Sequence, residues 1–231
     1  LKGHYNGAVK IYLTAIHPED KKGEKERKRF FFENWGHWQE CLKKAKTVFE
    51  KRAFRLLIKR VERPFLRILQ AIPEEELSMY FSAFQSYLWN LVAHNIVKIY
   101  GGELLRYRGN YWDYLFYRTP QSFDYLKGLV IPTASQRAVM PDELTGEIYN
   151  NILKERELKP SMFNLKKIRK AFFKSTPRPL IVIPVIKEYS DMDDELYRGR
   201  RCLYIHFELP RGSYGTMFIK RILADGYQED N

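Results

Sequence analysis

The stretch Leu77–Val97 contains no formally charged residue, although 29% of the whole chain is charged. Three glutamates and Pro73 precede it and Gly101-Gly102 follows it, which are residue types that suit the first turn and the C-terminal end of a helix. Its many polar side chains do not belong in hydrocarbon. We therefore expect a buried core helix. Apolar residues recur in it at helical steps: Leu77, Phe81, Phe84, Leu88 and Leu91.

The opposite face of this predicted helix is polar. It carries Ser82, Gln85, Ser86 and Asn90. A buried amide that lacks a hydrogen-bond partner is costly, so such groups are nearly always paired. We expect Gln85 and Asn90 to hydrogen-bond a neighbouring loop or strand.

The chain is strongly basic. Its net charge is +12, its pI is about 9.5, and 15% of its residues are aromatic. Such a composition favours a polyanionic partner, nucleic acid first and an acidic membrane second. The alternative is a protein from a hot environment, since these are rich in Lys and Glu without binding RNA. A candidate phosphate track lies on one predicted helix: Arg52, Arg55, Lys59, Arg60, Arg63 and Arg67.

The chain ends and the cysteines indicate cellular context. Cys41 and Cys202 are isolated, which fits a reducing cytoplasm. We find no signal peptide, transit peptide or membrane span, and we expect a cytoplasmic protein without a membrane partner. The sequence begins at Leu1 within a helical pattern that has no clear cap, so it reads as the middle of a longer protein.

Elsewhere the elements are short and mixed. Helices are expected at 8–16, 141–157 and 216–223, a hairpin turn at Gly109-Asn110, and strands at 129–131, 179–187 and 202–209. The strand at 179–187 is apolar on both faces, whereas 202–209 alternates cleanly. The charge run 21–29 is expected to be a solvated loop or helix face. The acidic run 191–195 is expected to be a loop, and it lacks the pattern of a calcium site.

The best candidate site is the strand, loop and helix at 203–223. A helix N-terminus after a glycine-containing loop offers free amides to a phosphate, and Arg211, Lys220 and Arg221 add positive charge. Tyr214 lies between two glycines, where its ring is displayed and can stack on a base. The alternative is an ordinary turn in which Tyr214 closes the core. Common nucleotide, metal and hydrolase motifs are absent from the sequence.

Two segments carry a family resemblance. Residues 82–90 contain Gln-Ser-Tyr-Leu-Trp-Asn, which is similar to the Gln-Ser-x-x-Phe-Asn motif of the TruD family of RNA pseudouridine synthases, with Trp89 in place of Phe. Residues 207–223 resemble the closing segment of that family, Leu-Pro-x-Gly-Ser-aromatic-Ala-Thr and a helix, with Gly215 in place of Ala. The two motifs occur in the family's order, and the resemblance extends over residues 1–223.

The resemblance implies an activity and a site. In that family a uridine, usually of tRNA, is flipped out of the RNA, its N-glycosidic bond is broken and the base is reattached through carbon. An Asp performs this chemistry without cofactor or metal. Tyr214 matches the aromatic residue of the pocket, and Gln85, Ser86 and Asn90 match a motif that supports it. The substrate-binding residues that we predict are Tyr214, Arg211, Gly212, Ser213 and Lys220.

One departure from the family pattern concerns catalysis. The catalytic Asp belongs to a Gly-x-Lys-Asp-Lys motif, and this chain has no such motif. We therefore identify no catalytic residue here, and we expect the chain alone to be inactive, with the missing N-terminal part as a partner. Two other functions stay open: a non-catalytic RNA-binding protein that kept the scaffold, and a basic helical module that binds a protein.

The predicted fold class is α+β, with a pseudouridine-synthase-like catalytic core of mixed or antiparallel sheet and helices. Residues 1–101 are predicted to be the helical part of that core and 102–176 an inserted small α+β lobe. Residues 177–231 are predicted to return to the core as strands and a C-terminal helix.

Overall fold

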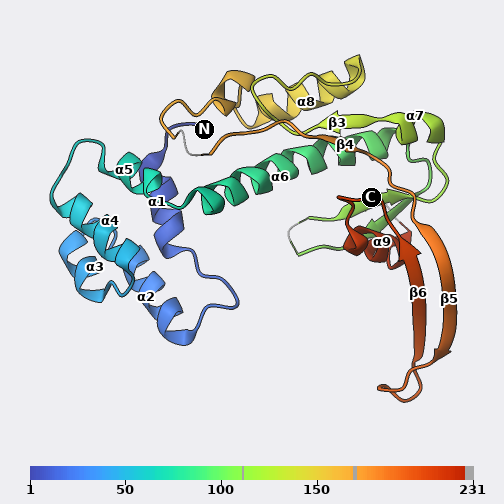
Figure 1. Cartoon of the computed structure of the whole chain (residues 1–231), viewed down its shortest axis with the longest axis horizontal. Coiled ribbons are helices and arrows are strands. Elements are labelled where there is room, and N and C mark those ends of the chain that lie inside the picture. The colour runs from blue at the N-terminus through green and yellow to red at the C-terminus, as the bar shows by residue number, and fades with distance from the viewer. Residues whose placement is uncertain (111, 169–170, 227–231) are drawn as a thin grey trace, which may run out of the picture. The chain divides into compact units, whose positions relative to one another are not determined.

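The computed structural model describes residues 1–110, 112–168 and 171–226 (Figure 1). The chain folds as two compact units. The first comprises Leu1–Gln85 and Leu158–Lys174, and the second comprises Ser86–Glu157 and Ser175–Asn231. These boundaries differ from those of the predicted core and inserted lobe. Compactness alone does not identify a catalytic core, so that division stays a prediction.

The uncharged stretch forms the helix that was predicted. Helix α6 spans Glu74–Tyr100, with three glutamates in its first turn and Lys98 in its last. It ends where a side chain on Gly101 would collide with the carbonyl oxygen of Val97. Leu77 and Leu88 are buried as expected, together with Val92 and Ile96. The division between the two units falls within this helix, after Gln85.

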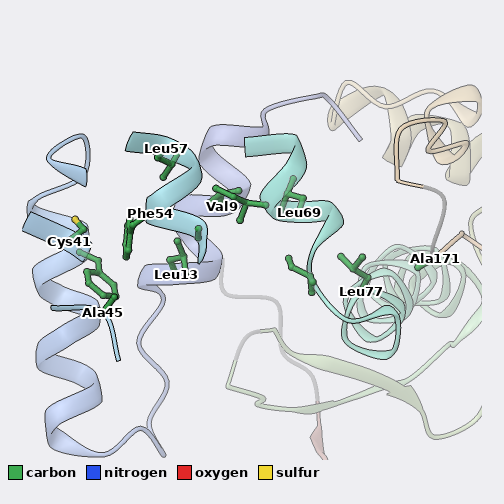
Figure 2. Packing of buried hydrophobic residues seen from close by; sticks show 13 residues of the cluster. Val9, Leu13, Cys41, Ala45, Phe54, Leu57, Leu69, Leu77 and Ala171 are labelled. Atoms are coloured by element: carbon green, nitrogen blue, oxygen red, sulfur yellow. The ribbon is translucent and has the colours of Figure 1, made fainter. Parts of the chain in front are cut away.

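The first unit is helical. Besides the start of α6 it contains α1 (Tyr5–Thr14), α2 (Lys22–Glu33), α3 (Trp38–Lys44), α4 (Val48–Ile58), α5 (Pro64–Gln70) and the 3₁₀ turn η1 (Pro160–Phe163). Its buried cluster draws apolar residues from α1, α2, α3, α4, α5 and α6, among them Val9, Phe54 and Leu69 (Figure 2). The charge run 21–29 lies mainly in α2, as the helix face that was one of its two predicted forms.

The second unit combines helices with three small antiparallel sheets. Strands β1 (Leu104–Tyr107), β2 (Tyr114–Tyr117) and β7 (Asp225–Gly226) form one sheet in the order β2-β1-β7. Strands β3 (Val130–Pro132) and β4 (Pro177–Pro179) form a second, and β5 (Val185–Asp193) and β6 (Arg201–Glu208) a third. Its further helices are α7 (Phe123–Gly128), α8 (Glu143–Glu155) and α9 (Gly215–Ile222). The α+β class is confirmed.

The predicted hairpin forms, but with a longer turn. Tyr107 pairs with Tyr114, so residues 108–113 connect β1 to β2 where a two-residue turn at Gly109-Asn110 was expected. A side chain on Gly109 would collide with the Trp112 carbonyl and press on the Tyr114 ring. The glycine is therefore required by close packing within the loop.

The predicted strand at 179–187 is not continuous, since only Pro179 and residues 185–187 of it lie in strands. Strand β4 ends at Pro179, residues 180–184 have no strand structure, and β5 begins at Val185. Pro179 and Pro184 lack the N–H that a continuous ladder would need. The apolar residues Ile183, Val185 and Ile186 are about half exposed, not buried.

The predicted acidic loop at 191–195 is also largely strand. Residues Asp191 to Asp193 belong to β5. Arg201 on β6 bonds the Asp191 carboxylate at 3.0 Å and the Asp193 carboxylate at 3.1 Å. These cross-strand ion pairs offset the like charges and extend the ladder. The connection between the strands therefore spans residues 194–200.

Candidate functional site

The bend after β6 is a tight turn that requires glycine. The amide of Ser213 donates to the Pro210 carbonyl at 3.1 Å, which closes a four-residue turn. Gly212 is the third residue of that turn and has φ of 88°, a value that side-chain-bearing residues rarely adopt. Proline is common at the second position of such a turn, whereas in this turn Pro210 occupies the first position. The local sequence therefore fixes the direction in which the chain enters α9.

This turn displays Tyr214. The residue is the N-cap of α9, and 64% of its surface is exposed. The packing beneath the turn is supplied by other residues, because Phe207 contacts Phe218 with ring centroids 4.5 Å apart. Gly215 lies against Phe207 and Leu209. Tyr214 is thus not the residue that closes the core, and its ring is open to a ligand.

The three cations around this bend have different surroundings. Arg211 is exposed and has no side-chain partner in the described part of the chain. The Lys220 ammonium lies 3.8 Å from the centre of the Tyr114 ring. Arg221 donates to the Tyr117 carbonyl at 2.8 Å, so it holds α9 against β2. The structure thus brings Tyr214, Arg211, Gly212 and Ser213 together at one bend, whereas Lys220 faces the hairpin.

The polar motif on α6 is engaged in structural contacts. Gln85 is buried and its Nε2 donates to the Lys174 carbonyl at 2.9 Å, which confirms its predicted loop partner. Ser86 accepts a hydrogen bond of 3.1 Å from Arg178 on β4. Trp89 donates to the Ile131 carbonyl on β3 at 3.0 Å. Asn90 is half-buried and forms no side-chain hydrogen bond with the described residues, so its predicted partner is not found there.

Sequence reasoning missed the arginines that hold this motif. Arg178 lies 92 residues from Ser86 in the sequence. Arg156 donates from Nη2 to the Tyr87 hydroxyl at 3.1 Å and lies 69 residues from Tyr87 in the sequence. No spacing rule connects residues so far apart. The single available signal was the surplus of hydroxyl and amide acceptors on the helix, which predicts that donors exist without locating them.

The basic stripe on α4 and α5 is exposed as predicted. Arg63 lies 3.5 Å from Glu62, and both side chains are mostly exposed. The other five cations of the stripe have no carboxylate partner within the described residues. Helix α4 is held in place at its start, where Thr47 and Glu50 form a capping box and Glu50 also bonds Arg27 at 3.0 Å. The sequence predicts one helix here, but the six cations extend over α4, the connection after it and α5. An exposed row of cations, five of them without a carboxylate partner among the described residues, suits a polyphosphate backbone.

Neither a metal site nor a membrane span is found within the described residues. No group of three or more His, Cys, Asp or Glu side chains in them gathers in a way that could hold a metal ion. None of the helices within them combines the length and apolarity needed to cross a membrane.

Comparison with known proteins identifies the family. The profile of the family described as tRNA pseudouridine synthase D (TruD) matches residues 1–102 and 127–222. The chain belongs to the TruD family. Both motifs discussed above, on α6 and at the closing bend, lie within the matched residues, apart from the last residue of the second. Between residues 1 and 222 the TruD profile leaves residues 103–126 unmatched, and these include the β1–β2 hairpin.

Individual TruD proteins are similar to this chain over nearly all of its length. The chain is 33% identical over 234 residues to a protein of Methanococcus maripaludis named probable tRNA pseudouridine synthase D 1, covering 96% of this chain and 58% of the relative. It is 29% identical to the tRNA pseudouridine synthase D of Leptospira interrogans, covering 96% of this chain and 56% of that protein. The chain thus spans a little over half the length of these TruD relatives.

A solved structure shows the same fold. The crystal structure of the putative tRNA pseudouridine synthase D from Methanosarcina mazei superposes with a TM-score of 0.70 at 21% identity. The match covers 93% of this chain and 53% of that one. The mixture of helices and small antiparallel sheets is therefore the TruD fold over this part of the family's length.

Proposed function

We propose that this chain is the RNA-holding part of a TruD-type tRNA pseudouridine synthase, an isomerase that converts a specific uridine to pseudouridine. Family membership and the names of the relatives support the activity, and tRNA is the substrate that those names give. The observation that carries the proposal is the exposed Tyr214 ring, held by the left-handed Gly212 in the family's closing motif. Such an enzyme works on tRNA in the cytoplasm, where Cys41 and Cys202 stay free thiols.

The physical requirement is the replacement of lost base stacking. A base that is flipped from RNA loses the stacking of its neighbours, at a cost of a few kcal/mol. An aromatic side chain that meets the base recovers much of that energy. Tyr214 offers such a face, and Arg211 beside it offers positive charge to the flanking phosphate. We keep Gln85, Ser86 and Asn90 as proposed supporting residues, because the family motif contains them and Ser86 binds Arg178 of β4.

The family's chemical step is performed by the Asp of a Gly-x-Lys-Asp-Lys motif, and this sequence does not contain that motif. We propose that a segment outside the 231 residues supplies it and completes the catalytic core with residues 177–231. The exposed apolar side chains of the β5–β6 ribbon support this, since Tyr189 is 74% exposed and Leu203 and Tyr204 are each about half exposed. A two-stranded ribbon is marginally stable by itself and gains from such packing.

The alternative function is a non-catalytic RNA-binding protein on the same scaffold. The lack of a Gly-x-Lys-Asp-Lys motif in these 231 residues fits both functions. The two functions differ in what the gene encodes before Leu1, where an in-frame Lys-Asp-Lys segment selects the enzyme. Both bind RNA, with the α4–α5 stripe following the phosphate backbone, whereas the third possibility, a protein-binding module, does not.

The test of the site compares Tyr214→Ala and Tyr214→Phe in binding to unmodified tRNA. We expect the alanine variant to bind roughly tenfold more weakly and the phenylalanine variant nearly normally, because the ring face is what stacks. Tyr197→Ala is the control: Tyr197 is also exposed and lies beside Arg200, in the turn between β5 and β6. Equal affinity of the two alanine variants would contradict a nucleotide site at Tyr214.

A further inference from the structure

Four aromatic rings of the second unit form a continuous row. Tyr87 of α6 contacts Trp112 with ring centroids 5.8 Å apart, and Trp112 contacts Tyr114 at 5.9 Å. Tyr114 in turn faces Tyr107 across the hairpin at 6.4 Å. The interplanar angles lie between 49° and 59°, so the rings are tilted and not stacked flat on one another. Ring surface is therefore left that another planar group can cover.

A cation lies at each end of this row. The Lys220 ammonium is 3.8 Å from the Tyr114 ring centre and 5.8 Å from that of Tyr107. At the other end the Arg156 guanidinium lies 5.5 Å from the Tyr87 ring. A lysine held over a ring keeps N–H donors for another acceptor. Lys220 has no carboxylate partner among the described residues, so its charge is not neutralised.

The most accessible ring is Trp112. It is 38% exposed, whereas the three tyrosines are half-buried. Gly109 permits the loop to fold closely against Tyr114 and the Trp112 backbone, which holds the indole in the row. Six of the fifteen residues 104–118 are aromatic.

We propose that the β1–β2 hairpin is a second RNA contact, which stacks an unpaired base on Trp112 and binds the adjacent phosphate through Lys220. Aromatic rings interleaved with cations are the chemistry that binds single strands without strong sequence preference. The hairpin lies in residues 103–126, which the family profile leaves unmatched. The inference rests on the proposed RNA-binding function.

The test uses the complete 231-residue chain and two probes, a labelled oligouridylate and an RNA duplex. We expect Trp112→Ala to weaken oligouridylate binding roughly tenfold to a hundredfold, and Trp112→Phe to retain most of the affinity. Duplex binding should not change, since paired bases are not available to stack. Tyr197→Ala, which removes an exposed ring beside an arginine elsewhere, should bind both probes as the unaltered chain does.

Fluorescence provides a readout that does not depend on the alanine variant. Oligouridylate should quench the unaltered chain more strongly than Trp112→Phe, since stacking quenches the indole. Equal quenching, or unchanged affinity of Trp112→Ala while the unaltered chain binds, would overturn the hairpin site and leave the proposed function standing. If the unaltered chain binds neither RNA probe, both proposals fail. A loss of duplex and oligouridylate affinity together in Trp112→Ala would point to a general effect of the substitution and not to stacking of an unpaired base, and would also overturn the site.

Discussion

Gly212 and Gly215 stand three residues apart at the closing bend and have different requirements. Gly212 has φ of 88°, so Gly212→Ala should lower the free energy of unfolding by about 1–2 kcal/mol. At Gly215 a methyl group would meet Phe207 at 3.7 Å, an ordinary contact, within helix α9. Gly215→Ala, which restores the family's usual residue, should be neutral or stabilise by up to about 1 kcal/mol.

Urea unfolding of the two variants checks this contrast. The midpoint should fall for Gly212→Ala and stay or rise for Gly215→Ala, at an unchanged slope. Equal destabilisation by both substitutions would show that the bend does not have the described backbone.

Gln85 gives a second prediction for a single residue. Its buried amide donates to the Lys174 carbonyl, so Gln85→Leu removes the donor while it keeps the volume. We expect a loss of about 1–3 kcal/mol, the cost of a buried polar group that loses its partner. Thermal unfolding measures it. Ser82→Ala, on an exposed position of the same helix, is the control and should change stability by less than about 0.5 kcal/mol.

The environment of a single residue could be predicted where its residue type requires one kind of environment. A buried glutamine needs a partner, so the hydrogen bond of Gln85 could be predicted. The sequence predicts Gly212 as a substrate-binding residue, and its left-handed backbone was found only in the structure. Arg178 and Arg156 could not be predicted, because they reach α6 from segments that are distant in sequence. Asn90 lies on the same predicted face as Gln85, yet it is half-buried without a described side-chain bond, since position on a helix face does not fix depth of burial.

At the scale of elements, the N-terminus of α8 depends on Asp142. Its carboxylate accepts from the Thr145 amide at 2.8 Å and from the Tyr125 hydroxyl at 2.9 Å. Burial opposes its ionisation, but these hydrogen bonds outweigh it, and the net effect lowers the pKa of Asp142 below its ordinary value of 3.8. A lowered pKa means that the folded state binds the proton less readily than the unfolded chain.

The stability that Asp142 contributes is therefore present above pH 3.8 and is lost as the pH falls through the lower folded value. Asp142→Ala should cost about 1–2 kcal/mol at neutral pH through loss of the cap. Asp142→Asn keeps a capping oxygen and should remove this part of the acid-side loss. Unfolding measured across the acid range would contradict the assignment if the asparagine variant loses stability as steeply as the unaltered chain.

The basic stripe on α4 and α5 predicts a salt dependence. Arg55→Glu with Lys59→Glu should reduce the slope of log affinity for tRNA against log salt by roughly 1–2, because each phosphate contact contributes about 0.7–0.9. Lys43→Glu on α3 is a suitable control, since Lys43 is exposed but already paired with Glu40 at 2.8 Å. An unchanged slope in the double variant would exclude the stripe from the RNA interface.

Elements with a strong period could be predicted, and those decided by proline or by ion pairs could not. Helix α6, helix α8 and strand β6 follow clear periodicity and formed nearly where expected. The run 179–187 has the composition of a buried strand, but its two prolines interrupt the ladder. Asp191 and Asp193 lie in β5, where Arg201, ten residues beyond Asp191, pairs with both.

At the scale of the whole molecule, the chain has the fold of a little over half of a TruD protein. The match covers 93% of this chain and 53% of the solved Methanosarcina mazei chain. The sequence could predict the family because both motifs fall within its length, but the catalytic Asp motif does not. We propose that a segment outside the 231 residues covers the apolar residues that are exposed on β5 and β6.

The most direct measurement is pseudouridine formation in unmodified tRNA by two proteins: the 231-residue chain alone, and the same chain joined to the segment that its gene encodes upstream. We predict no pseudouridine with the chain alone and multiple turnovers with the joined protein, abolished when the aspartate of the upstream Lys-Asp-Lys is changed to asparagine. Pseudouridine made by the 231 residues alone would contradict the assignment of the chemistry to an outside Asp. Tight tRNA binding without any turnover by the joined protein would contradict the enzyme and select the non-catalytic alternative.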